Sequence, residues 1–159
     1  MNQYQSLLEE LIEQERVLQF KKFNSQTALT IGLLLVDKAR EGNKMIAIDI
    51  TLHGHQLFHY ALEGTTPDNS EWIKRKCRVV NRFHMSSYRM GIKLKNDNIS
   101  IQDKYFVDPA EYAPHGGSFP IIIKEVGYVG TIAVSGLPQE EDHKMVVDTI
   151  REYLKDLES

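Results

Sequence analysis

The sequence is organised around residues 115–143, HGGSFPIIIKEVGYVGTIAVSGLPQEEDH. Apolar residues alternate with other residues over 119–124 and again over 128–134, which predicts two β-strands. Gly127 lies between the two segments, so the strands are expected to pair as a hairpin. Pro138 then begins a helix, and the acidic residues that follow it suit the positive end of the helix dipole.

Two glycine-rich corners border this hairpin, Gly116-Gly117 before it and Ser135-Gly136 after it. Each corner lies one strand length from Gly127, so a hairpin places both at the same end of the sheet. Glycine permits close approach, and the first N–H groups of a helix lack partners within the helix. We therefore expect a small concavity lined by backbone donors, suited to an anion. If the acidic residues at 140–142 instead accept from these donors, the corners are capped from within and need no ligand.

Composition limits the class of protein. A length of 159 residues suits a single domain, 1–159, whose core needs no disulfide or metal to be stable. The formal net charge of -3 and the pI near 6.1 provide no overall positive field. Neither nucleic acid nor an anionic membrane is therefore expected as a partner.

The compartment is indicated by three features. Cys77 is the single cysteine, which excludes an internal disulfide and fits a reducing environment. The longest strongly apolar run, residues 31–36, is much shorter than a membrane span. Residues 1–15 are acidic where a signal peptide is basic. We expect a cytoplasmic protein.

The N-terminal part contains two helical patterns. Residues 4–20 carry one apolar stripe on an acidic helix, so residues 1–22 are expected to form an amphipathic extension. This extension is expected to dock on the body of the protein or on a neighbouring subunit. Asn24 or Ser25 is placed to cap a second helix over residues 26–41.

The middle of the chain begins with strict alternation over residues 44–62, which predicts a second hairpin. Asp68 and Glu71 have the spacing of a capping box for one long helix that reaches about residue 93. The inward stripe of that helix becomes smaller and more polar toward its C-terminal end, where something other than hydrocarbon is expected to meet it. The stripe consists of Ile73, Cys77, Val80, His84, Ser87 and Gly91.

Irregular structure is expected over residues 95–114, apart from one helical turn at 108–111, where Asp, Pro and Glu take N-cap, N1 and N3 positions. The last helix is expected over 139–157, with its apolar residues on one face. Helices and hairpins in this order predict an α+β fold, in which helices cover a mainly antiparallel sheet.

Three segments carry a resemblance to a known family: HGGSFPI, GTIAVSGLPQEEDH and NRFHMSS. They resemble an uncharacterised family of small bacterial and fungal proteins within the GlcG/HbpS/PduO C-terminal superfamily, usually labelled haem-degrading. The positions that look like the superfamily's glycine-proline segment, its strand and turn, and its acidic helix start are Gly116, Gly117, Pro120, Gly130, Val134, Ser135, Gly136 and Asp142.

The resemblance implies a profilin-like α-β-α sandwich for residues 1–159, homo-oligomers and, in some members, haem or iron binding. Haem is thus the one cofactor that the resemblance suggests. The long N-terminal helix and the FPIII run depart from the superfamily pattern, and this branch has no assigned activity.

The histidines are weighed for metal or ligand binding. On a strand, residues four apart, such as His55 and His59, lie roughly 13 Å apart, too far for one metal ion, so these and His53 are interpreted as surface residues. His84 lies on the inward stripe and is the best buried candidate, as a hydrogen-bonded core residue or as a ligand. His115 either faces solvent or faces a ligand, and both alternatives stay open. His143 is expected to be neutral and exposed. No metal site is predicted.

Three other features have plain interpretations. Cys77 lies on the apolar stripe, where a buried inert thiol is the common case. Ser135 lacks the G-x-S-x-G pattern of a catalytic serine. The basic residues of the middle helix, from Lys74 to Lys93, lack a nucleic-acid recognition motif, so they form either a solvated face or one that meets an acidic helix of another subunit.

Three functions remain as hypotheses. The leading one is an oligomeric module that binds haem or another small anion between the glycine corners and the helix end. The second is an oligomeric scaffold with a vestigial pocket, and the third is a haem-degrading enzyme, for which no catalytic residues can be named. The candidate ligand-binding residues are His84, Ser87, His115, Gly116, Gly117, Ser118, Pro120, Ser135 and Gly136.

Overall fold

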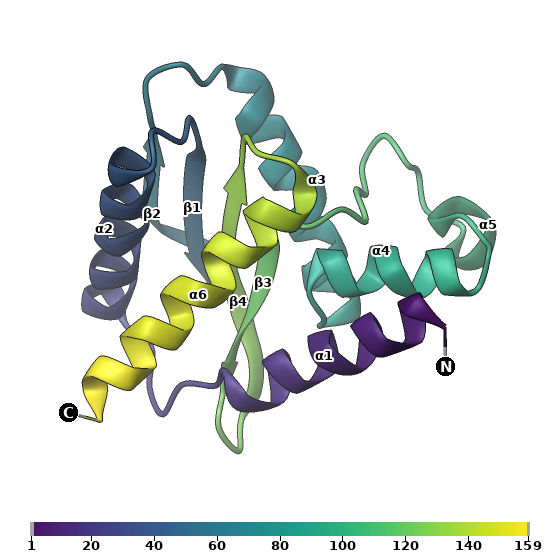
Figure 1. Cartoon of the computed structure of the whole chain (residues 1–159), viewed down its shortest axis with the longest axis horizontal. Helices are drawn as coiled ribbons and strands as arrows, with labels where there is room; N and C mark the ends of the chain where they lie inside the picture. The colour runs from purple at the N-terminus through teal and green to yellow at the C-terminus, as the bar shows by residue number, and fades with distance from the viewer. Residues whose placement is uncertain (1, 159) are drawn as a thin grey trace.

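The computed structural model describes residues 2–158 as an α+β fold with helices on both faces of one antiparallel sheet (Figure 1). This confirms the expected α-β-α sandwich. None of the described helices has the length and apolar character needed to cross a bilayer. The elements are α1 (Gln3–Val17), α2 (Ser25–Glu41), β1 (Ala47–Leu52), β2 (His55–Ala61), α3 (Pro67–Phe83), α4 (Ser87–Asn96), α5 (Ile101–Tyr105), β3 (Ser118–Ile123), β4 (Gly127–Ser135) and α6 (Gln139–Leu157).

The sheet has the strand order β2-β1-β4-β3, with each neighbouring pair antiparallel. Both predicted hairpins are confirmed, β1 with β2 and β3 with β4, and the strand bounds of β3 and β4 lie within one residue of those expected. The hairpins meet at the central pair, where Ile50 of β1 lies opposite Ile132 of β4. The two middle strands of the sheet are therefore far apart in the sequence.

One face of the sheet forms the main hydrophobic core. Strand alternation directs the large apolar residues to this face, where α2 and α6 cover them (Figure 1). The expected cap of α2 is confirmed: Asn24 Oδ1 accepts a hydrogen bond from Thr27 N at 3.0 Å. The fully buried strand residues of this face are Ile48, Ile50, Phe119, Ile121, Ile132 and Val134, and Ile46, just before β1, is also fully buried.

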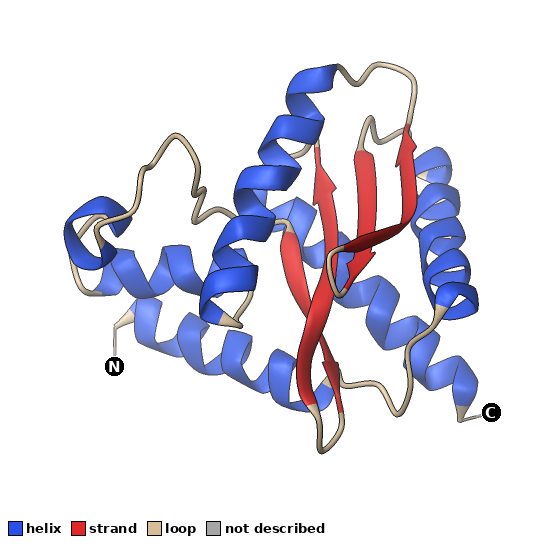
Figure 2. Cartoon of the chain, turned by 180° about the vertical axis from the view of Figure 1, so that it is seen from behind, coloured by secondary structure: helices blue, strands red, loops and turns tan. Residues whose placement is uncertain are grey.

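The opposite face of the sheet carries small and polar residues and is covered by α3 (Figure 2). Helix α3 packs mainly on β3 and β4 and contacts β1 much less, so the described helices leave the half of this face formed by β1 and β2 largely uncovered. Ala47, Ile73 and Ala133 form a small apolar cluster under the helix, with Cys77 packed against it. Polar side chains on this face are therefore placed between the sheet and α3.

Helix α1 docks on the body of the same chain. Leu11 packs against Tyr88 and Ile92 of α4. Glu15, which interrupts the apolar stripe, is buried and forms an ion pair with Arg89 at 2.9 Å. Of the two expected docking places for the N-terminal helix, the structure therefore shows the first.

The prediction of a single long helix that reaches about residue 93 is wrong. The chain leaves the helix at His84, which adopts a left-handed conformation (φ 56) as the C-cap of α3. Ser86 then begins α4, because its Oγ accepts a hydrogen bond from Arg89 N at 3.1 Å. The apparent stripe that joined Val80 to Ser87 therefore spans two separate helices.

The region before β3 also differs from expectation. A short helix, α5, lies within residues 95–114, where the sequence predicts irregular structure. The single helical turn expected at 108–111 is confirmed: Tyr112 N donates to Asp108 O at 3.1 Å, and Asp108 Oδ1 accepts from Ala110 N at 2.8 Å. Helix α3 begins slightly earlier than the predicted capping box, with Asn69 Oδ1 accepting from Thr66 N at 2.9 Å.

Candidate functional site

The two glycine corners lie side by side at one end of the sheet, as the hairpin required. Val134 N donates to Gly117 O at 2.9 Å, which ties the end of β4 to the corner before β3. Gly117 (φ 142) and Gly136 (φ 143) both need conformations that other residues rarely adopt. A Cβ atom on Gly117 would lie 2.5 Å from Val134 O and 2.7 Å from Lys76 Nζ. The corner therefore accepts only glycine at this position.

A buried ion pair lies beneath the corners. Lys76 Nζ and Asp142 Oδ2 are 3.1 Å apart, and the two side chains are 5% and 1% exposed. Burial raises the pKa of the Asp142 carboxyl to about 6, an effect that the Lys76 charge offsets only in part. The sequence assigns Lys76 to a solvated or intersubunit basic face, and this is corrected: its ammonium lies inside the protein against a carboxylate.

The backbone donors of the corners are largely satisfied by the chain itself. Asp142 Oδ1 accepts from Leu137 N at 3.0 Å, and Gln139 Oε1 accepts from Gly116 N at 3.0 Å. Ser118 N donates to Ser87 Oγ at 3.1 Å. This is the internally capped alternative considered from the sequence, so the corners do not present a row of free N–H groups.

A cavity of about 370 Å³ nevertheless opens beside the corners, and we refer to it as the corner pocket. It brings together three of the predicted residues, His115, Ser135 and Gly136, with the buried ion pair. The complete lining is Asp68, Asn69, Trp72, Lys76, His115, Ser135, Gly136, Leu137, Gln139 and Asp142.

A second cavity, of about 540 Å³, lies on the other side of His115, and we refer to it as the loop pocket. It lies between α4 and the segment that precedes β3, and its walls are largely apolar. Since His115 lines both cavities, it lies where the two adjoin. The complete lining is Arg75, Gly91, Leu94, Lys95, Asn98, Ile99, Ser100, Ile101, Pro109, Tyr112, Ala113, Pro114 and His115.

The surroundings of His115 are positively charged. Burial, and after it the charges of Lys76, Lys95 and Arg75, lower the pKa of His115 below its usual value, so the ring is neutral at neutral pH. The ring packs edge-on against Trp72, with centroids 6.0 Å apart. This neutral imidazole is therefore a hydrogen-bonding or ligating group in an environment that favours anions.

Arg75 is held in place from two sides. Its guanidinium lies 4.4 Å from the centroid of the Trp72 ring, and one of its NH2 groups donates to Pro109 O at 2.9 Å. Within residues 2–158, its buried Nε has no hydrogen-bond partner. A donor that is fixed, charged and incompletely used lines the loop pocket.

Sequence reasoning missed Trp72, Arg75 and Lys95 as members of this site. The three residues follow no motif, and Lys95 reaches the site only because α4 turns away from α3 at His84. The adjacency of the single tryptophan to a basic run is the one local signal that could have indicated them.

Three predicted site residues lie elsewhere. His84 is exposed, which corrects its assignment as a buried residue, and its ring stacks on Tyr128 with centroids 4.3 Å apart. Ser87 is buried and its Oγ bridges the backbone of Ser118, donating to the carbonyl at 3.3 Å. Pro120 lies inside β3 opposite Thr131. None of these three residues lines the corner pocket or the loop pocket, and neither do the predicted residues Gly116, Gly117 and Ser118.

His143 is expected from the sequence to be exposed, and this is wrong. It is 4% exposed, with its Nε2 2.7 Å from Gln14 Oε1 of α1, and burial lowers its pKa to about 4. The ring is therefore neutral, as expected, but it joins α1 to α6. Within residues 2–158, no group of three or more histidine, cysteine or acidic side chains has the arrangement of a metal site.

Solved structures share this fold. The crystal structure of the Ybr137w protein matches with a TM-score of 0.89 at 35% identity, covering 96% of this chain and 90% of that chain. The crystal structure of a complex of PduOC with haem matches with a TM-score of 0.67 at 12% identity, covering 81% of this chain and 93% of that one. At 12% identity, the similarity to the PduOC structure concerns the fold alone.

Sequence comparison identifies the family. The UPF0303 protein of Streptomyces coelicolor is 47% identical over 145 residues, covering 91% of this chain and 92% of the relative. The UPF0303 protein of Rhizobium etli is 46% identical over 153 residues, covering 96% and 93%. A family model described as haem degrading protein HbpS-like matches residues 23–151. The chain therefore belongs to the UPF0303 family and carries an HbpS-like domain.

Proposed function

We propose that the protein is a binding module for a small organic anion, held at His115 between the corner pocket and the loop pocket. The observation that carries this proposal is the positive environment of a neutral imidazole that lines two adjoining cavities. Arg75 and Lys95 line the loop pocket and supply the charges for a carboxylate.

Haem is a suitable member of this ligand class, because it combines carboxylates with an iron that accepts a neutral imidazole. His115 would ligate the iron, Arg75 and Lys95 would pair with the carboxylates, and the apolar wall of the loop pocket would contact the ring. A protein of the same fold has been solved as a haem complex, at 12% identity, which supports haem as the first probe.

A binding function is favoured over catalysis by the state of the nucleophiles. Burial raises the pKa of Cys77 to about 11, so the thiol is protonated at neutral pH. Ser135 is buried at the end of β4. The neutral His115 has the protonation state of a ligand or of a hydrogen-bond acceptor.

Titration with haem, followed by the Soret band, tests the proposal. We expect saturable binding that His115→Ala abolishes and that Arg75→Gln weakens about 10-fold to 100-fold, the range for a lost hydrogen bond to a charged group. His53→Ala is the matched control, because His53 lies in the exposed β1–β2 turn. The absence of saturable binding for both haem and citrate would contradict the proposal and favour the scaffold hypothesis.

A further inference from the structure

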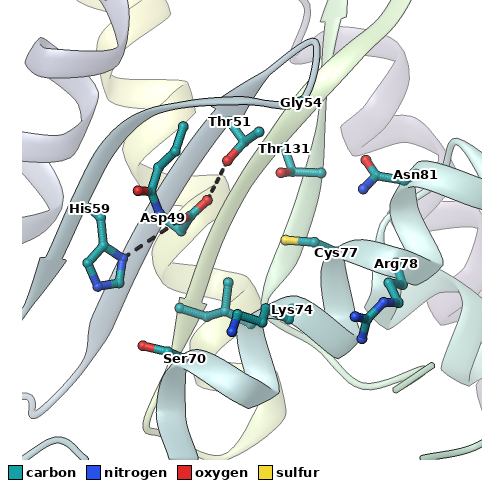
Figure 3. Close-up of a pocket in the computed structure, with 12 residues that line it drawn as sticks. Asp49, Thr51, Gly54, His59, Ser70, Lys74, Cys77, Arg78, Asn81 and Thr131 are labelled. Atoms are coloured by element: carbon teal, nitrogen blue, oxygen red, sulfur yellow. Dashed lines mark hydrogen bonds and ion pairs between the residues drawn. The ribbon is translucent and has the colours of Figure 1, made fainter. Parts of the chain in front are cut away.

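A third cavity, of about 370 Å³, lies between α3 and the uncovered half of the sheet (Figure 3). We refer to it as the sheet pocket. It shares no lining residue with the corner pocket or the loop pocket, which lie on the other side of α3. Its lining consists of Asp49, Thr51, Gly54, Gln56, His59, Ser70, Ile73, Lys74, Cys77, Arg78, Asn81 and Thr131.

The wall formed by the sheet contains a buried carboxylate. Asp49 follows Ile48 and precedes Ile50, which face the hydrophobic core, so strand alternation directs Asp49 to the α3 side. Its side chain is oriented by two neutral donors: Thr51 Oγ1 donates to Oδ1 at 2.7 Å, and Gln56 Nε2 donates to Oδ2 at 2.5 Å. The carboxylate is thus fixed in one orientation at the pocket wall.

Asp49 differs from the other buried acids in its counter-charge. Glu15 pairs with Arg89 at 2.9 Å, and Asp142 pairs with Lys76 at 3.1 Å. Within residues 2–158, the ion-pair contact of Asp49 is with His59 Nδ1 alone, at 3.7 Å, and a histidine is charged only when protonated. Asp49 is only 8% exposed, and a buried carboxylate without a cation is costly. A ligand cation would supply the missing charge.

The helical wall of the pocket is positively charged. Lys74 and Arg78 lie one turn apart on α3 and both line the cavity. Lys74 pairs with Glu71 at 3.1 Å, and Arg78 pairs with Glu111 at 3.2 Å. Both ion pairs are exposed to solvent and are therefore weak. Both cations can exchange these partners for a ligand carboxylate at little cost.

We propose that the sheet pocket binds a small zwitterion of the amino acid class, with its ammonium group on Asp49 and its carboxylate on Lys74 and Arg78. One negative wall and one positive wall fit a molecule that carries both charges. The volume lies at the lower end of the about 300–1,000 Å³ found for ligand pockets, which favours a small side chain. Thr131 and Cys77 between the two walls would contact the rest of the molecule.

Isothermal titration calorimetry with three matched probes tests this proposal. L-2-aminobutyrate carries both charges, butyrate lacks the ammonium group, and propylamine lacks the carboxylate. We expect saturable binding of aminobutyrate alone. Equal binding of butyrate or propylamine, or no saturable heat with aminobutyrate, would overturn the proposal.

Variants locate the binding site. Asp49→Asn keeps the shape of the side chain and removes its charge, and it should weaken aminobutyrate binding about 10-fold to 100-fold. Asp103→Asn, a change of the same kind on the short helix α5, is the control and should bind like the parent protein. Unchanged affinity in Asp49→Asn would overturn the assignment.

A second variant keeps the test decisive if Asp49→Asn does not fold. The ion pairs that Lys74 and Arg78 form within residues 2–158 are exposed, so Lys74→Gln with Arg78→Gln should fold normally. Loss of aminobutyrate binding in this variant supports the proposed carboxylate contact, and full retention refutes it. Haem titration of the same variant should be unaffected, because neither residue lines the pockets at His115.

Discussion

Lys76 Nζ and Asp142 Oδ2 form a buried ion pair that joins α3 to the first turn of α6 beneath the glycine corners. The partners lie 66 positions apart in the sequence. Asp142 also accepts from Leu137 N, which precedes α6. One carboxylate therefore fixes both the start of α6 and its position against α3. The pair therefore positions the floor of the corner pocket.

Removal of one partner should be strongly destabilising. Lys76→Met leaves the Asp142 carboxylate buried without a cation, so urea unfolding should show a loss of about 3–5 kcal/mol. Lys76→Met combined with Asp142→Asn should recover much of this loss, because no charge is then buried. If Lys76→Met alone lowers the free energy of unfolding by less than about 1 kcal/mol, Lys76 does not compensate a buried charge on Asp142.

His143 should make the protein sensitive to acid. Burial lowers the pKa of its ring to about 4 from an ordinary 6.5. Between these values the unfolded chain binds the proton more readily, so stability is lost as the pH falls from about 6.5 to about 4. In His143→Gln, the unfolding free energy should decrease less over this window, by about 1–3 kcal/mol.

As the pH falls, Asp142 should have the opposite effect on stability to that of His143. Its pKa is raised to about 6 from 3.8, so its protonation adds stability as the pH falls through this range. The parent protein and His143→Gln both contain Asp142, so its contribution cancels when the two pH profiles are subtracted. If the unfolding free energies of the parent protein and His143→Gln change in parallel with pH, His143 is not the source of the acid sensitivity.

Gly117 should tolerate substitution less well than another glycine of positive φ. At Gly54 (φ 77) a Cβ atom would meet no other atom within 4 Å, so Gly54→Ala should cost only the backbone strain, about 1–2 kcal/mol. In Gly117→Ala the new methyl group also meets Val134 O, which adds about 1–3 kcal/mol. Thermal denaturation of both variants measures the difference, and equal losses would count against a steric role for the corner.

Cys77 should react slowly with alkylating agents. Burial raises the pKa of its thiol to about 11 from 9.0, which lowers the thiolate fraction at pH 8 by about 100-fold. Iodoacetamide labelling, followed by mass spectrometry, should therefore be slow in the folded protein and should reach the rate of a free cysteine in urea. Rapid labelling of the folded protein would exclude a protonated thiol at this position.

Self-association stays a prediction from the sequence. Leu29 and Leu33 of α2 are 44% and 49% exposed, and Tyr60 of the edge strand β2 is 40% exposed. We expect light scattering to give a multiple of the 18.3 kDa chain mass, and Leu33→Glu to lower it. A monomer at micromolar concentration would refute the expectation.

The strands were predictable because their residues obey a local rule. Alternation of Ile46, Ile48 and Ile50 with smaller or polar residues is a direct consequence of having one face in the core. The glycine corners were also predictable, since a hairpin must return its two ends to the same edge of the sheet. These inferences need no knowledge of distant partners.

The break between α3 and α4 was not predictable from spacing. Val80, His84 and Ser87 continue a helical period, and the left-handed residue that ends α3 is a histidine rather than a glycine. Ser86, a good N-cap residue, was the local signal, but it competed with the apparent stripe.

Burial of charged residues depended on tertiary partners. Lys76 lies in a run of basic residues, and only Asp142 distinguishes it from its exposed neighbours. His143 is buried because α1, from the other end of the chain, covers it through Gln14. The positive surroundings of His115 arise in the same way, so the sequence located the site through its glycine corners and the adjacent His115 but not through its charged residues.

The central pairing of β1 with β4 has a consequence for synthesis on the ribosome. Strand β1 carries Ile48 and Ile50, yet its inner neighbour is completed only at Ser135. During translation the first hairpin must wait, with one edge unpaired and an apolar face exposed, until most of the chain has emerged. Slow translation before residue 127 should therefore prolong exposure of an aggregation-prone edge, and a chaperone that binds apolar strands would act at this stage.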